Sequence, residues 1–254
     1  MNPRPLHLTI CLLTLVVAGT TAGAQQQQIH PKGYLHLSLG YATQALGEVN
    51  DAIEDDEQIF RSLGVPLSWD TFGGALEFGG GLEFMVSETV SLGASVGIQK
   101  SSVNNVYSDY SGSFSDKADL RVIDVSGTLT LWPPTSRGLF LGASMGVAFG
   151  KANSETRFRV YSDSDYDLDV EGEFTGKGLS LGVFSGYQGR IGRTGLLFVK
   201  AGYRHRNLGE FDGEFCSPQV GCWDTEAQNN AGQALDFDFS GFYLAGGVGF
   251  ALGR

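Results

Sequence analysis

The sequence lacks any apolar run long enough to form a membrane-spanning helix. The run from Leu8 to Val17 is far shorter than the roughly 20 residues that such a helix needs, and no longer one follows it. Arg4 precedes this run, and Ala22-Gly23-Ala24 follows it as a small-residue cleavage pattern. We therefore expect a signal peptide over residues 1–24 and one exported domain over residues 25–254.

Basic residues are also scarce, with 17 Lys and Arg against 28 Asp and Glu and a net charge of −11. Binding to nucleic acid requires a basic patch, so this balance argues against a nucleic-acid partner. The acids crowd into three stretches, 48–70, 163–173 and 210–226, which predicts a strongly acidic external surface. Basic residues mark the short connections instead: Arg137, Arg190, Arg193 and Arg254.

Cysteine and proline are few, at 3 and 7 residues, and no low-complexity linker divides the mature chain. Cys11 lies in the leader. Cys216 and Cys222 flank Ser-Pro-Gln-Val-Gly, and in an exported protein we expect this pair to form a disulfide. A metal site is the weaker alternative, because two thiols do not complete a tetrahedral set of ligands. No cofactor is indicated.

What the sequence does contain is strict alternation, seen most clearly from Val90 to Gln99. Aliphatic residues alternate there with glycine and serine, so the segment predicts a strand with one apolar face and one face of small residues. Small residues suit the crowded interior of a narrow closed barrel. The aliphatic face would then point outward, into lipid.

Seven further segments show the same alternation. Short turns at Ser87–Thr89, Pro133-Pro134 and Gly192–Thr194 alternate with long connections, one of them expected from Tyr107 to Lys117. This layout predicts an all-β fold: an eight-stranded antiparallel up-and-down transmembrane β-barrel with short periplasmic turns and long extracellular loops. The other seven expected strands contain the following segments: Gly33–Ala42, Gly73–Val86, Ile123–Leu131, Leu139–Phe149, Leu179–Val183, Leu197–Tyr203 and Phe242–Leu252.

The last strand carries a more specific pattern, a glycine followed by hydrophobic residues at Gly247, Val248, Phe250 and Leu252. In this the chain resembles the small eight-stranded outer-membrane barrels, comparable to the transmembrane domain of OmpA and to OmpX. The resemblance implies contact with outer-membrane lipid and lipopolysaccharide, and recognition by the barrel assembly machinery through the C-terminal strand. The chain departs from the family pattern in ending with Arg254 rather than an aromatic residue.

A soluble lipocalin-like barrel would place its apolar face inward, around a ligand. Against this alternative, Phe84, Trp132 and Phe250 lie near the short-turn ends of their strands, where an interfacial aromatic girdle is expected.

Six ionisable residues have the parity of the barrel interior. We expect Glu77, Asp124 and Arg204 at one height, and Glu83, Lys200 and His36 lower down. Charges in a narrow interior must pair, so the prediction is a salt-bridge plug. The alternative is a gate, in which exchange of partners opens a thin water path for a small solute.

His36-Leu37-Ser38 is a candidate hydrolytic pair, since outer-membrane lipid A deacylases use a His-x-Ser pair with an acidic partner. That chemistry requires a lipid-facing site near the outer leaflet. Here both side chains are expected to point inward near the periplasmic end, which favours an ordinary interior role and no enzymatic activity.

The long loops contain two further patterns. Acids alternate along residues 163–173, where they are expected to extend the sixth strand, and Arg157 and Arg159 could pair with them; divalent cation binding is the weaker alternative. Asp236 and Asp238 predict either a membrane boundary below them or a bulge at Ser240-Gly241. An apolar stripe at helical spacing predicts a short helix that caps the barrel mouth or binds a partner: Leu46, Val49, Ile53, Phe60 and Leu63.

The sequence thus favours a non-enzymatic outer-membrane barrel with a structural role, or one that contacts an unidentified extracellular partner through acidic loops. A narrow solute channel is the second hypothesis and a lipid-modifying enzyme the third.

Overall fold

Eight antiparallel strands close into a ring in the computed structural model, which describes residues 32–62, 68–134, 138–161, 167–229 and 232–253. The C-terminal strand completes the ring, because it pairs with the first strand on one side and with the seventh on the other. This confirms the predicted barrel. Its strands are β1 (Gly33–Thr43), β2 (Gly74–Met85), β3 (Val90–Ser108), β4 (Gly112–Leu131), β5 (Leu139–Val160), β6 (Leu168–Ile191), β7 (Gly195–Glu210) and β11 (Gly241–Leu252).

The two faces of the ring are as the alternation predicts. Leu37, Leu141 and Val183 are more than half exposed on the outside, at 54%, 54% and 60%. The interior is crowded: a Cβ built on Gly93 would lie 2.5 Å from Cγ of Glu83 and 2.8 Å from Oγ1 of Thr128. Glycine and serine therefore face inward because larger side chains do not fit.

The strands are tilted relative to the barrel axis. A row of paired residues that starts at Gly33 on β1 passes through all the ring strands and returns to β1 beside Thr43, at the other end of the strand. Such a stagger is the condition for closing a sheet into a barrel. One consequence is that each row of directly paired residues lies closer to the extracellular side at β6 than at β1.

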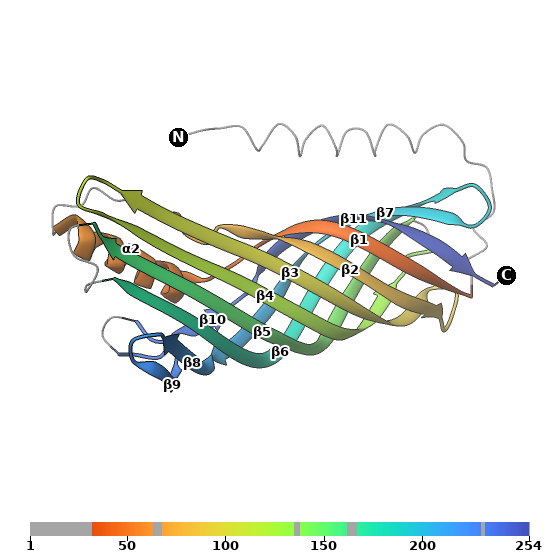
Figure 1. Ribbon diagram of the computed structural model, residues 1–254. Helices are drawn as coiled ribbons and strands as arrows, with labels where there is room; N and C mark the ends of the chain where they lie inside the picture. The colour runs from red at the N-terminus through yellow and green to blue at the C-terminus, as the bar shows by residue number, and fades with distance from the viewer. Residues whose placement is uncertain (1–31, 63–67, 135–137, 162–166, 230–231, 254) are drawn as a thin grey trace.

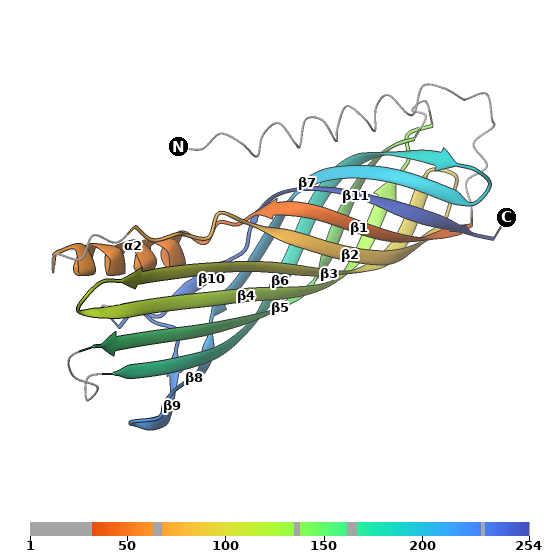
Figure 2. The ribbon, with the colours of Figure 1, turned by 45° about the horizontal axis from the view of Figure 1, so that its top comes forward.

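Strands β3 to β6 continue far beyond the others and form a tall sheet, here called the wall (Figures 1 and 2). They are 19, 20, 22 and 24 residues long. The loop expected from Tyr107 to Lys117 is therefore wrong, since only Asp109–Ser111 separate β3 from β4. Asp109 makes this tight turn possible: it accepts hydrogen bonds from the Ser111 hydroxyl and amide and from the Gly112 amide. These bonds lower the pKa of Asp109 to about 2.

The predicted helix is confirmed as α2 (Gly47–Ser62), which lies against the inner face of the wall at the extracellular end (Figures 1 and 2). Asn50 holds the helix to the segment that precedes β2, because its side chain exchanges two 2.9 Å hydrogen bonds with the backbone of Phe72. Farther along the helix, Phe60 packs on Phe114 of β4, with ring centres 5.0 Å apart. The helix therefore caps the barrel mouth, the first of its two predicted roles. Leu63 lies outside the described residues.

Three short strands that the sequence did not indicate complete this end: β8 (Asp212–Ser217), β9 (Gly221–Glu226) and β10 (Asp236–Asp238). The β8–β9 hairpin pairs with β6, and β10 pairs with β7. The pairing of β10 with β7 shifts register between Asp236 and Asp238. The bulge predicted at Ser240-Gly241 is therefore misplaced, because the register with β7 is continuous from Asp238 to Gly241.

An apolar cluster, here called the upper cluster, fills the barrel mouth beneath α2. Phe211 is fully buried within it, stacks on Phe237 at 4.0 Å between ring centres, and lies directly against Gly150 and Gly176. Its other fully or nearly buried members are Leu46, Val49, Phe72, Val103, Leu120, Val122, Ala148, Ala152, Phe174, Leu208, Ala227 and Phe239.

A smaller lower cluster closes the periplasmic end of the lumen, formed by Tyr34, Trp132, Phe140 and Leu196. This corrects the predicted girdle at one position. Phe84 and Phe250 are exposed on the outside, at 53% and 49%, but Trp132 turns inward and is only 5% exposed. Trp132 follows Leu131, which faces outward, so the alternation of β4 continues through Trp132 and turns its side chain inward.

None of the helices among the described residues is long and apolar enough to cross a membrane. The expected signal peptide over residues 1–24 lies outside the described residues and stays a prediction.

Replacing Phe211 by Ala is expected to lower the free energy of unfolding by about 3–5 kcal/mol, the usual cost of deleting a buried phenyl ring. Urea titration in detergent micelles, read from the difference in migration between unboiled and boiled protein, measures this change. Val220→Ala is the control, because Val220 is 77% exposed; its effect should stay within about 0.5 kcal/mol. If both variants unfolded at the same urea concentration, the upper cluster would not stabilise the barrel.

Candidate functional site

The barrel interior contains the predicted ionic network. Arg204 of β7 donates two hydrogen bonds to Glu77 of β2 across the lumen, at 2.9 Å from Nη1 to Oε2 and 3.1 Å from Nη2 to Oε1. Its guanidinium also lies over the ring of Tyr243, 4.6 Å from the ring centre. This bidentate geometry fixes Arg204 in place and confines Glu77 to one orientation.

Arg206, which was not predicted, completes the network. It is 2% exposed and donates a 2.7 Å hydrogen bond to Gln99. Its Nε lies 3.7 Å from Oδ2 of Asp124, and its Nη2 lies 3.8 Å from Oε2 of Glu77. Two guanidinium groups thus face two carboxylates, and the charges balance. The parity of β7 contained the signal, since Arg206 follows Arg204 by two residues and must share its face.

The other three predicted residues lie lower and do not join this network. Glu83 accepts hydrogen bonds from the Tyr34 hydroxyl and, at 2.8 Å, from Ser91. Among the described residues, no carboxylate lies within ion-pair distance of Lys200, whose Nζ is 5.7 Å from the ring centre of Phe184. His36 is buried against Phe198 in an edge-to-face contact of 5.7 Å.

The ionic network lies between the two apolar clusters. The upper cluster covers it on the extracellular side, and the lower cluster lies beneath it on the periplasmic side. Water crossing the lumen would have to displace well-packed aromatic side chains at both levels. The arrangement is that of a plug, whose charges are neutralised internally.

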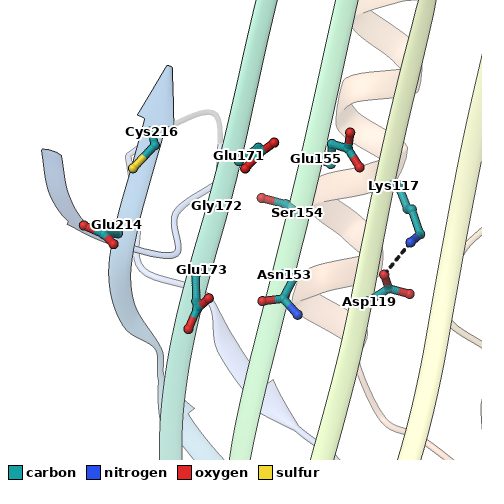
Figure 3. A pocket seen from close by; sticks show the side chains of 10 residues that line it. All are labelled: Lys117, Asp119, Asn153, Ser154, Glu155, Glu171, Gly172, Glu173, Glu214 and Cys216. Carbon is teal, nitrogen blue, oxygen red and sulfur yellow. Dashed lines mark ion pairs between the residues drawn. The ribbon is translucent and has the colours of Figure 1, made fainter. Parts of the chain in front are cut away.

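A second polar site lies on the outer face of the wall, in a groove of about 390 Å³ (Figure 3). Two pairs of carboxylates stand directly opposite one another across its strands: Glu155 with Glu171, and Glu173 with Glu214. Figure 3 shows these side chains on neighbouring strands, with α2 behind the sheet. The lining residues are Lys117, Asp119, Asn153, Ser154, Glu155, Glu171, Gly172, Glu173, Glu214 and Cys216.

Basic residues neutralise the negative charge of this groove only in part. Lys117 pairs with Asp119 at 2.7 Å, and Lys151 pairs with Glu173 at 2.6 Å. The sequence predicts that Arg157 and Arg159 pair with the alternating acids of β6. This is confirmed for Arg159, which donates hydrogen bonds of 2.7 Å to both carboxylate oxygens of Asp169. Arg157 instead pairs with Glu155 on its own strand. Asp163 and Asp165 lie outside the described residues.

The predicted disulfide between Cys216 and Cys222 is present, with the sulfurs 2.05 Å apart. It joins two directly paired residues of the β8–β9 hairpin, which is held beside the groove. Glu214 lies close to both sulfurs. A disulfide supplies no thiolate, so these three residues do not form a metal site.

A closed ring of antiparallel strands with an apolar outer band and a filled polar interior is the architecture of a transmembrane β-barrel. The chain is therefore an integral protein of the bacterial outer membrane, in contact with membrane lipid. Its fold is that of the small eight-stranded outer-membrane barrels.

The chain is similar to several solved barrels. They include Ail, the attachment invasion locus protein of Yersinia pestis (11% identity, 86% of this chain and 98% of that chain, TM-score 0.43). They also include OprG from Pseudomonas aeruginosa (13%, 90% and 100%, TM-score 0.44) and a major outer membrane protein from Thermus thermophilus (10%, 86% and 98%, TM-score 0.49). No family model and no curated protein sequence matches the chain.

Replacing Arg206 by Met is expected to destabilise the barrel by about 3–5 kcal/mol, because the substitution leaves a buried carboxylate without compensation. Adding Asp124→Asn restores the balance of charge and should recover part of this loss. The urea midpoint in detergent measures both variants. Lys117→Gln, which breaks the exposed pair with Asp119, is the control and should cost about 1 kcal/mol or less. Equal losses in the single and double variants would show that the charges are not coupled.

Proposed function

We propose that this protein is a non-conducting, non-enzymatic outer-membrane barrel that presents the wall to extracellular partners and binds a cationic segment of such a partner in the acidic groove. The observation that carries the proposal is the pairing of like charges across the groove. Carboxylates directly opposite one another on neighbouring strands destabilise a sheet. The presence of these opposed carboxylates on an exposed face is explained if a cation from outside the chain neutralises their negative charge.

The extent of the wall supports the same role. Strands β3 to β6 continue well above the apolar band, and α2 and the β8–β9 hairpin brace them. A barrel needs only about 9–11 residues per strand to cross the membrane, whereas β6 has 24. Most of the additional chain therefore builds a rigid surface outside the membrane.

The lumen argues against the two alternative functions. A channel requires a continuous water path, and both apolar clusters lie across it. A lipid hydrolase requires a catalytic pair that faces the bilayer, but His36 is buried inside the barrel against Phe198. Among the described residues, no hydrogen bond joins His36 to Ser38.

In planar bilayers we expect no unitary currents from the reconstituted protein, because the upper and lower clusters close the lumen. A porin of known conductance, incorporated under the same conditions, confirms that insertion can be detected. Reproducible unitary currents that disappear in Arg204→Gln would favour the channel hypothesis over the one proposed.

Binding to the groove can be measured with a fluorescent oligolysine peptide and the protein in detergent micelles. The triple variant Glu171→Gln, Glu173→Gln and Glu214→Gln should bind about tenfold more weakly, since each exposed charge contributes about 0.5 kcal/mol and 1.4 kcal/mol is a factor of ten. Added salt should weaken the wild-type complex.

A matched control removes three exposed acids from α2 at the same end of the molecule, in the variant Asp51→Asn, Glu54→Gln and Asp55→Asn. This control should retain most of the affinity of the wild type. If both triple variants lost affinity equally, the peptide would be responding to overall charge, and the groove would not be the binding site.

A further inference from the structure

Four basic residues form an arc on the outside of the barrel, at the foot of the wall. Lys100 of β3, Arg121 of β4 and Lys151 of β5 are direct partners across adjacent strands. Lys177 continues the series on β6, opposite Phe149. Because strands in a sheet are about 4.8 Å apart, the first three lie within about 10 Å of one another. These four residues are called the basic arc.

The basic arc concentrates positive charge in a chain whose net charge is −11. Lys151 pairs with Glu173 at 2.6 Å, but over the described ranges no ion pair involves Lys100, Arg121 or Lys177. Like charges directly opposite one another destabilise a sheet. Most carboxylates of the wall lie above the arc, and Asp212 lies in the same row beyond Thr175, so the chain neutralises this site only in part.

The position of the basic arc indicates where an anion that neutralises its positive charge would come from. The next outward residues towards the membrane are apolar: Ile98 on β3, Ile123 on β4, Phe149 on β5 and Leu179 on β6. The arc therefore lies where the apolar band ends on the extracellular side. Lysine and arginine at such a boundary extend their charged ends into the headgroup layer of the outer leaflet.

An apolar hollow lies below the basic arc, on the lipid-facing side of the same strands. It has a volume of about 770 Å³, and its floor is formed where small outward residues, Gly127 and Ala143, interrupt larger ones. Met145, Leu181 and Val183 border it. Met145 is about 20 Å from Lys151 along β5, at about 3.4 Å per residue. With a strand tilt of 35–45° this corresponds to a depth of about 15 Å, roughly one leaflet of hydrocarbon.

We propose that the basic arc and the hollow together bind one molecule of a phosphorylated glycolipid of the outer leaflet, the lipid A part of lipopolysaccharide. Its phosphates contact the arc, and one acyl chain occupies the hollow. The site shares one ion pair with the acidic groove, Lys151 with Glu173, but Lys100, Arg121 and Lys177 do not line the groove, so the proposal does not depend on the function proposed above. Binding of this lipid would also fix the height of the wall relative to the membrane surface.

The test uses the full-length folded protein in detergent micelles, with bound lipid A quantified by native mass spectrometry. The variant Lys100→Gln, Arg121→Gln, Lys151→Gln and Lys177→Gln should lose more than about 100-fold in affinity, since each basic residue at a lipid surface contributes about a factor of five. Dephosphorylated lipid A should bind the wild type as weakly as intact lipid A binds this variant. Retention of phosphate-dependent binding by the variant would overturn the proposal.

Arg190→Gln with Arg193→Gln is the control, because these basic residues lie at the opposite, periplasmic end of the barrel. This variant should bind lipid A like the wild type. Phosphatidylglycerol should bind all proteins weakly, and equally tight binding of it would show that the arc recognises any anionic lipid. Migration of unboiled protein establishes that each variant is folded.

Gly127→Leu tests the hollow separately. A Cβ at this position meets no atom closer than 3.8 Å, so the substitution fills the hollow without disturbing the backbone. We expect it to reduce lipid A affinity several-fold while dependence on the phosphates remains. Unchanged affinity would show that the acyl chain lies elsewhere.

Discussion

The constraint on which the structure depends is the absence of water in the hydrocarbon layer. Every backbone N–H and C=O at that depth must be paired within the protein, and a sheet achieves this only by closing on itself. The pairing of β11 with both β1 and β7 provides the closure. Closure then imposes the tilt of the strands and the narrow interior. The interior in turn admits glycine, serine and a few charges, four of which pair with one another, whereas Lys200 lies against the ring of Phe184.

The same constraint explains how charge is distributed over the molecule. Inside the lumen, where solvation is poor, two arginines and two carboxylates balance one another. On the wall, where water is present, charges of the same sign can gather in separate zones. Acids occupy the groove on the upper part, and bases occupy the arc at the membrane boundary. The two partners that we propose match this separation, a cationic segment above and an anionic lipid below.

Much of the fold was predictable because period-two alternation directly reports which side of a strand faces lipid. The order of the strands, the short turns, the capping helix and the disulfide followed from local pattern. The extension of β3 and β4 did not, because Tyr107 to Lys117 lack the aliphatic alternation that lipid imposes. On the wall the outward residues face water and are polar. Trp132 was misplaced for a different reason: its position near a short turn favoured the interfacial girdle, whereas the alternation of β4, with Leu131 outward, turns Trp132 inward.

The sequence by itself determined that the chain is an outer-membrane barrel and which residues point inward, since both depend only on alternation along each strand. It could not determine which inward or outward residues meet, because that depends on the register between strands distant in sequence. Register brought Arg206 to Asp124 and Gln99, and left Lys200 apart from them. It also aligned Lys100, Arg121 and Lys151 into one arc. Only the closed tertiary structure decided these contacts, because the tilt of the ring sets every pairing at once.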